Sequence, residues 1–134
     1  MASKKNILTA SNIKYLLVMK ELSGDHNGVR SVDIAKRLQI KKPSVYTMVK
    51  TLQGLKLIKK DRYSVIYFTE QGFELAKKYL SCFETIRIYL ETLLPENSDV
   101  KSAACALLAE ISEDDIEKIC SKLKKESEDE KHVS

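Results

Sequence analysis

No apolar run in the 134-residue sequence approaches the roughly 20 residues of a membrane-spanning helix. The opening Met-Ala-Ser-Lys-Lys-Asn lacks the apolar core of a signal peptide. Neither a glycine-rich phosphate loop nor a nucleophile–base pair is present, and the acidic pair Asp114-Asp115 suits the start of a helix. These absences predict a cytoplasmic protein without membrane contact and without enzymatic activity.

Cysteine and histidine are scarce and widely spaced. No Cys-x-x-Cys motif occurs among Cys82, Cys105 and Cys120. Of the two histidines, His26 falls in a predicted loop and His132 in a predicted tail. This distribution argues against a structural zinc site. Because the cysteines are odd in number and lie within helical patterns, we expect three reduced, largely buried thiols rather than a disulfide framework.

The charge is unevenly distributed along the chain. Residues 1–75 contain 14 Lys and Arg against 6 Asp and Glu, a net charge of +8. Residues 76–134 contain 9 against 13, a net charge of −4, which leaves +4 for the whole chain. A basic first half suits a head that binds a polyanion. Two solvated surfaces of unlike sign are the alternative interpretation.

The most informative segment is Ser31–Leu52, which predicts two short helices meeting at a tight corner. The first turns Ile34, Ala35 and Leu38 inward, and the small side chain of Ala35 allows a close approach. After the turn Gln-Ile-Lys-Lys, Pro43 suits the first turn of the second helix, where its missing N–H needs no partner. The inward apolar positions of that helix are Val45, Met48, Val49 and Leu52.

The flanking segments complete a winged helix-turn-helix. Residues 11–23 have apolar side chains at helical spacing, and the glycine-containing residues 24–28 indicate a loop. Gly54 is expected to cap the second corner helix. Residues 57–69 are rich in β-branched and aromatic side chains around a turn at residues 61–64, which predicts a β-hairpin. A hairpin in this position is a wing.

A helix-turn-helix of this kind places its second helix in the DNA major groove. Lysines at the start of that helix and basic residues in the hairpin suit phosphate neutralisation. Ser44 and Thr47 suit base edges, and Tyr46 suits a thymine methyl group or a phosphate. An ordinary exposed helix face is the alternative. The predicted DNA-binding residues are Lys41, Lys42, Pro43, Ser44, Tyr46, Thr47, Lys50, Lys59, Lys60 and Arg62.

The second half of the chain predicts three helices. The first begins at Thr69 or Glu70 and reaches about Leu94, where Pro95 and the residues after it break the pattern. The second covers about residues 100–111, and Ser112 caps the third. These helices have more apolar surface than they can bury alone, so we expect a symmetric dimer. The predicted domains are a winged helix-turn-helix at 1–75, a helical dimerisation domain at 76–125, and a disordered tail at 126–134.

Three motifs carry a family resemblance: Asp33-Ile34-Ala35, Pro43-Ser44-Val45 and Thr69-x-x-Gly72. With the order of elements over residues 11–125, the chain resembles the diphtheria toxin repressor and manganese transport regulator family, in its two-domain form without a third domain. The resemblance implies a mainly α fold with a small β-hairpin wing. It also implies a homodimeric transcriptional repressor that binds a palindromic site in double-stranded DNA, under the control of Mn²⁺ or Fe²⁺.

The family's metal-ligand positions are poorly matched by this sequence. Among them only Cys105 is a residue type that the family uses at its position, and the others offer almost no oxygen or nitrogen donors. The resemblance thus implies a degenerate metal site and no confident cofactor. The positions are Lys14, Leu17, Phe83, Cys105, Leu108 and Ala109.

Several alternatives remain open at this point. In one interpretation the apolar residues at the degenerate metal positions pack together as part of the core. In the other, a shifted metal site is formed by Cys82, Glu84, Cys105 and Glu110. In one interpretation the Lys14 ammonium occupies the place of the metal ion and pairs with Glu84 or Glu110. In the other, Lys14 is solvated. A small-molecule pocket or thiol oxidation is another possible signal. The alternative to DNA binding is that the winged helix is a protein-interaction module, in which tyrosines 46, 63 and 67 contact a protein partner.

Overall fold

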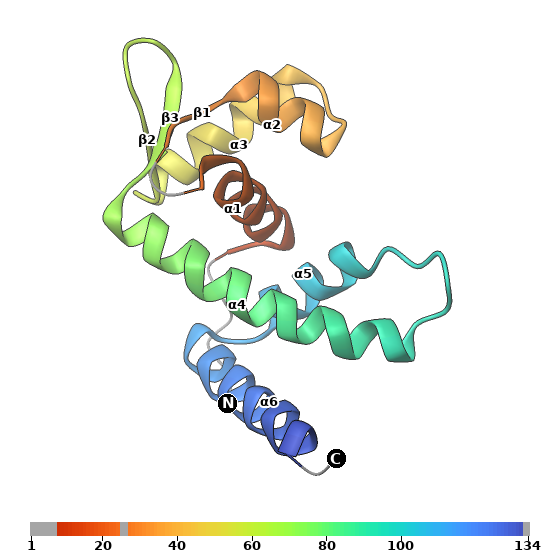
Figure 1. Ribbon diagram of the computed structural model, residues 1–134. Coiled ribbons are helices and arrows are strands. Elements are labelled where there is room, and N and C mark those ends of the chain that lie inside the picture. Colours follow the sequence, from red (N-terminus) through yellow and green to blue (C-terminus); the bar gives the residue numbers. More distant parts are fainter. Residues whose placement is uncertain (1–7, 25–26, 133–134) are drawn as a thin grey trace, which may run out of the picture. The chain divides into compact units, whose positions relative to one another are not determined.

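The computed structural model describes residues 8–24 and 27–132 (Figure 1). In that part of the chain, the elements in order are α1 (Ala10–Ser23), β1 (Val29–Arg30), α2 (Ser31–Leu38), α3 (Lys42–Gly54), β2 (Ile58–Lys60), β3 (Val65–Phe68), α4 (Glu70–Leu93), α5 (Val100–Glu110) and α6 (Glu113–His132). This order confirms the predicted fold class, which is mainly α with a small hairpin wing.

The chain divides into two compact units, and the division falls inside α4. Among the described residues, the winged unit falls within Lys14–Lys77, and the helical unit contains residues 8–13 and 78–132. The predicted domain border after residue 75 lies close to this division. No helix in the described ranges combines the length and the hydropathy that crossing a membrane requires.

The corner between α2 and α3 closes without a glycine. Ile34 and Ala35 of α2 are buried, as predicted, and Leu38 is half-buried. Gln39 adopts the left-handed conformation with φ 55°. The amide of Ile40 donates to the carbonyl oxygen of Ala35 over 3.0 Å, which closes the end of α2 and turns the chain into α3.

The end of α3 differs from the expectation at Gly54. Gly54 is the last helical residue, and Leu55 caps the helix in the right-handed conformation. The left-handed residue is Lys56, with φ 62°. The amide of Leu57 donates to the carbonyl oxygen of Leu52 over 3.1 Å, so the chain leaves the helix at Lys56 rather than at the glycine. The prediction of Gly54 as the capping residue is therefore wrong.

The wing belongs to a three-stranded antiparallel sheet of order β1-β3-β2. The β2–β3 hairpin confirms the predicted wing, whereas β1 has no counterpart in the sequence analysis. β1 pairs Val29 with Ile66, and both side chains are buried. Gly28 precedes this strand, and a Cβ there would lie 2.8 Å from Cζ of Tyr67. The missing side chain at Gly28 therefore allows Tyr67 to cover the backbone.

The wing joins α4 through the motif Thr69-x-x-Gly72. The Thr69 hydroxyl donates to the carbonyl oxygen of Lys56 over 2.8 Å and accepts from the amide of Gly72 over 3.0 Å. The Thr69 amide donates to the carbonyl oxygen of Leu57 over 3.0 Å. A Cβ on Gly72 would overlap that same carbonyl group, so the first turn of α4 packs directly on the Leu57 backbone.

In the helical unit, α6 is anchored to α4 at its first turns. The Ser112 hydroxyl accepts from the amide of Asp115 over 3.2 Å, which confirms the predicted cap. The Lys78 ammonium lies 3.5 Å from a carboxylate oxygen of Glu113 and 3.2 Å from one of Glu117. Of the α6 side chains that the structure describes, only Ile116 and Cys120 are buried.

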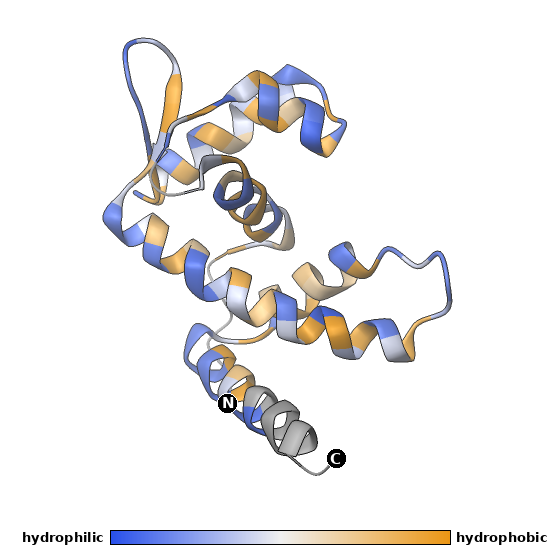
Figure 2. Ribbon diagram, viewed as in Figure 1, coloured by the Kyte–Doolittle hydropathy of each residue, from blue (hydrophilic) through white to orange (hydrophobic). Residues whose placement is uncertain are grey.

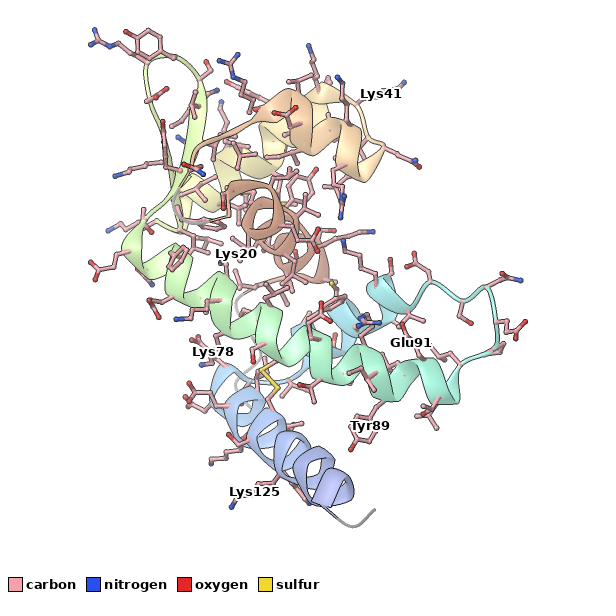
Figure 3. All side chains as sticks on the ribbon, in the orientation of Figure 1. Lys20, Lys41, Lys78, Tyr89, Glu91 and Lys125 are labelled. Carbon is pink, nitrogen blue, oxygen red and sulfur yellow. A yellow bond between two sulfur atoms is a disulfide. The ribbon has the colours of Figure 1, made fainter. Side chains whose placement is uncertain are left out.

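Cys82 of α4 and Cys120 of α6 form a disulfide, drawn as the yellow bond in Figure 3, with Cα atoms 5.4 Å apart. The prediction of three reduced thiols is therefore wrong for this pair. Helical spacing predicts burial of both residues, which holds. Their pairing depends on how α6 packs on α4, and a periodic pattern does not contain that information. Cys105 is buried and lies outside this disulfide.

α6 also extends further than expected, because it continues to His132. The polar composition predicts a disordered tail from residue 126, but the helix covers most of that segment. Glu and Lys predominate there, and neither Gly nor Pro interrupts residues 113–132. Both of these charged residues are good helix formers, which accounts for the longer helix.

Candidate nucleic-acid interface

The outward face of α3 is the centre of the candidate interface. Val45, Val49 and Leu52 are buried, which fixes the rotation of the helix about its own axis. The opposite face is exposed, as predicted, and Tyr46 retains 53% of its accessible surface. The exposed residues on this face are Pro43, Ser44, Tyr46, Thr47 and Lys50.

The N-terminus of α3 has two exposed lysines and no side-chain cap. Lys41 is the N-cap residue, and its side chain accepts no hydrogen bond from the helix. Lys42 follows as the first helical residue. Lys41 is labelled in Figure 3, at the turn between α2 and α3. A helix N-terminus attracts anions, and adjacent ammonium groups strengthen that attraction.

The Thr47 hydroxyl is engaged within the helix. It donates to the carbonyl oxygen of Pro43 over 3.1 Å, and the Thr51 hydroxyl donates in turn to the carbonyl oxygen of Thr47. The proton of the Thr47 hydroxyl is therefore already used, and its oxygen can act toward a base edge only as an acceptor.

The tip of the wing is ordered by Asp61. Its carboxylate accepts from the amides of Tyr63 and Val65 over 2.8 and 3.0 Å, and Ser64 takes up the left-handed conformation. Arg62 lies over the Tyr63 ring, with the guanidinium carbon 5.4 Å from the ring centroid. The hairpin also has a shallow depression of about 270 Å³, which is lined by Lys59, Lys60, Asp61 and Tyr67.

Tyr46 links α3 to the wing. The Lys50 ammonium lies 4.9 Å from the centroid of its ring, and the Lys60 ammonium lies 5.5 Å from it. Tyr46 and Lys50 are four residues apart in the helix, and this spacing predicts the contact between the Lys50 ammonium and the Tyr46 ring. The second contact joins residues from different elements, so no local spacing in the sequence predicts it.

The residues at the family's metal positions do not fit Mn²⁺ or Fe²⁺. Lys14 and Leu17 belong to the winged unit, and the other four belong to the helical unit. Leu17, Phe83, Cys105 and Leu108 are buried, whereas Lys14 and Ala109 are half-buried. A single thiol, an ammonium group and hydrocarbon do not supply the oxygen and nitrogen donors that these ions need. Across the described ranges, no three His, Cys, Asp or Glu side chains gather into a metal-binding group.

Two members of the alternative, shifted metal site have other partners. Cys82 is in the disulfide. Glu84 pairs with Arg87 over 2.9 Å, and Glu91 pairs with the same guanidinium over 2.6 Å. The hydrogen bond to Glu84, and to a smaller extent the one to Glu91, raises the pKa of Arg87 above its ordinary value. A site built from Cys82, Glu84, Cys105 and Glu110 therefore gains no support.

No family model matches the sequence. An uncharacterized HTH-type transcriptional regulator of Methanocaldococcus jannaschii is 34% identical over 92 residues, which cover 68% of this chain and 74% of that protein. The manganese regulator SloR has a TM-score of 0.68 at 24% identity, over 91% of this chain and 55% of its own. MepR of S. aureus, solved in a complex with DNA, has a TM-score of 0.56 at 24% identity, over 87% of this chain and 79% of its own.

These likenesses agree with the element order described above. The similarity to SloR confirms, for the fold, the resemblance to the diphtheria toxin repressor and manganese transport regulator family. This chain spans about half the length of SloR. The similarity to the archaeal regulator extends over most of both chains, so the protein belongs to the HTH-type transcriptional regulators.

Proposed function

We propose that this chain is a homodimeric transcriptional repressor that binds a palindromic site in double-stranded DNA. In this proposal α3 enters the major groove, and the β2–β3 wing follows the phosphate backbone. The observation that carries the proposal is the concentration of unneutralised positive charge along α3 and the wing.

That charge is unneutralised because the basic side chains of the interface have no acidic partners. Throughout the described residues, no carboxylate lies within 4.0 Å of Lys41, Lys42, Lys50, Lys59 or Lys60. By contrast, Lys78 and Arg87 of the helical unit each pair with two carboxylates. Unpaired cations attract phosphates, and the release of counterions drives binding. The neighbour MepR, solved with DNA, supports the same assignment.

Exposed apolar side chains in the helical unit support the dimer. Ile88 and Leu93 of α4 are 56% and 76% exposed, and Leu107 of α5 is 42% exposed. Figure 2 shows the hydrophobic stretches of α4 and α5 in orange. Large apolar side chains exposed on neighbouring helices are typical of a surface that a partner covers. A second copy of this chain is the partner that a palindromic site requires.

The residues at the metal positions favour a repressor that works without a metal ion. A protein-interaction module remains the second candidate, because Tyr46 and Tyr63 are exposed. Its third proposed contact, Tyr67, is half-buried and packs over Gly28. That packing favours DNA over a tyrosine-centred protein contact.

A titration of labelled duplex DNA, followed by fluorescence anisotropy at several salt concentrations, tests the proposal. The logarithm of the binding constant should fall linearly with the logarithm of the salt concentration. Lys50→Ala should lower the affinity about tenfold and reduce this slope by about two units, because each of the two subunits loses one phosphate contact. Tyr46→Ala should lower the affinity as well, with the dimer intact in both variants.

The matched control is Lys118→Ala, which removes an exposed lysine from a helix outside the interface. This variant should bind as the wild type does. Chelator should leave the affinity unchanged, and added Mn²⁺ or Fe²⁺ should not raise it. Salt-independent binding, or full affinity in both α3 variants, would contradict the role of α3. Loss of binding on chelation would contradict metal independence.

Charge placed on the exposed apolar side chains should disrupt the dimer. The wild type is expected to sediment at about twice the 15.2 kDa chain mass, and both Ile88→Glu and Leu93→Glu should shift it toward the monomer. Both side chains are largely exposed within one chain, so the substitutions should not unfold it. Val32→Glu changes an apolar side chain that is 36% exposed in the winged unit, and it should leave the mass unchanged. A wild-type monomer would contradict the dimer.

A further inference from the structure

Tyr46 has an unusual position, because ammonium groups from two different elements lie over one exposed ring. Lys50 reaches it from the next turn of α3, and Lys60 reaches it from the end of β2. Both distances, 4.9 and 5.5 Å, fall within the range of about 6 Å over which a ring attracts a cation. The ring is therefore a shared contact of α3 and the wing.

The strand register explains why Lys60 rather than Lys59 contacts the ring. Lys60 pairs with Ile66, which is fully buried, and Lys59 pairs with Tyr67. Paired residues point to the same side of a sheet, and successive residues alternate. Lys60 therefore points to the side of the sheet that packs on the core and is half-buried, whereas Lys59 points to the other side and is exposed.

An aromatic ring holds an ammonium group in a different way from a carboxylate. A carboxylate would orient the lysine and also cancel its charge, whereas the face of a ring orients it and leaves the charge in place. In the described part of the chain, neither Lys50 nor Lys60 has a carboxylate within 4.0 Å. Both ammonium groups therefore remain available to an anion.

We propose that Tyr46 is a positioning residue that holds Lys50 and Lys60 together for the phosphate backbone of duplex DNA. The ring fixes Lys60 relative to α3, so that the wing and α3 bind the phosphate backbone as one unit. This inference rests on the proposed DNA-binding function and assigns Tyr46 a role beyond its own contact with a base or phosphate.

A double-mutant cycle measured by DNA titration tests the inference. Tyr46→Leu should weaken binding about five- to tenfold, since both lysines lose their support, and should lower the salt slope. Tyr46→Phe keeps the ring and should recover most of the affinity. Lys60→Gln should weaken binding about tenfold in the wild-type background and less than twofold beside Tyr46→Leu.

Lys59→Gln is the matched control, because Lys59 is the neighbouring wing lysine and points away from the ring. Its effect on affinity should be the same with Tyr46 and with Leu at that position. Thermal melts should show all of these variants folded. An equal effect of Lys60→Gln in both backgrounds, or a Tyr46→Phe variant as weak as Tyr46→Leu, would overturn the inference alone. A wild-type protein that does not bind duplex DNA would overturn the proposed function and this inference with it.

Discussion

Gly72→Ala is expected to lower the free energy of unfolding by about 3 kcal/mol, the upper part of the range for overpacking. The new methyl group would meet the backbone of Leu57, with its Cβ 2.6 Å from the carbonyl carbon. That carbonyl oxygen also accepts from the Thr69 amide, so it cannot move aside without breaking a hydrogen bond. Urea unfolding followed by circular dichroism measures the loss.

Gly54→Ala is the matched control for this experiment. Gly54 also lies in a helix, and a Cβ there would meet nothing within 4 Å. Alanine is the better helix former by about 0.5–1 kcal/mol, so this variant should be slightly more stable than the wild type. Equal stability of the Gly72→Ala variant and the wild type would contradict the packing of α4 on Leu57.

Loss of the Cys82–Cys120 disulfide should destabilise the helical unit by about 4 kcal/mol, on the chain-entropy estimate for a loop of this length. The two cysteines are 38 residues apart, so the bond removes many conformations from the unfolded chain. Cys120 is also one of two buried side chains among those described on α6, so the bond lies in the buried part of this helix. Urea unfolding with and without reductant measures the difference.

Three variants separate this effect from other effects of reductant. The double variant Cys82→Ser/Cys120→Ser should be as unstable as the reduced wild type and insensitive to reductant. Cys105→Ala removes the thiol outside the disulfide and should keep the response to reductant. Identical unfolding midpoints for the oxidised and reduced wild type would contradict a stabilising role of the bond.

The elements that the sequence predicts well are those with strong local signals. Pro43 and the apolar spacing of Val45, Val49 and Leu52 suffice to place α3 and its exposed face. The turn that contains Asp61 lies between two segments rich in β-branched and aromatic residues, and this pattern suffices to predict the wing. In both places propensity, turn chemistry and hydrophobic spacing agree, which makes the local prediction reliable.

The features that do not follow from the sequence depend on contacts between distant segments. β1 has two residues, too few to show an alternating pattern, and it exists because β3 pairs with it. The bond between Cys82 and Cys120 depends on how α6 packs on α4. The contact of Lys60 with Tyr46 likewise requires the wing and α3 to be in place. None of these follows from local spacing.

The turns on either side of α3 share a property with practical value. Gln39 precedes the helix and Lys56 follows it, and both adopt positive φ without being glycine. Such a conformation costs a side-chain-bearing residue roughly 1–2 kcal/mol. Both residues are exposed, so glycine would fit either position along the same backbone path. These two sites are therefore natural starting points for engineering a more heat-resistant form of the protein without altering the exposed face of α3.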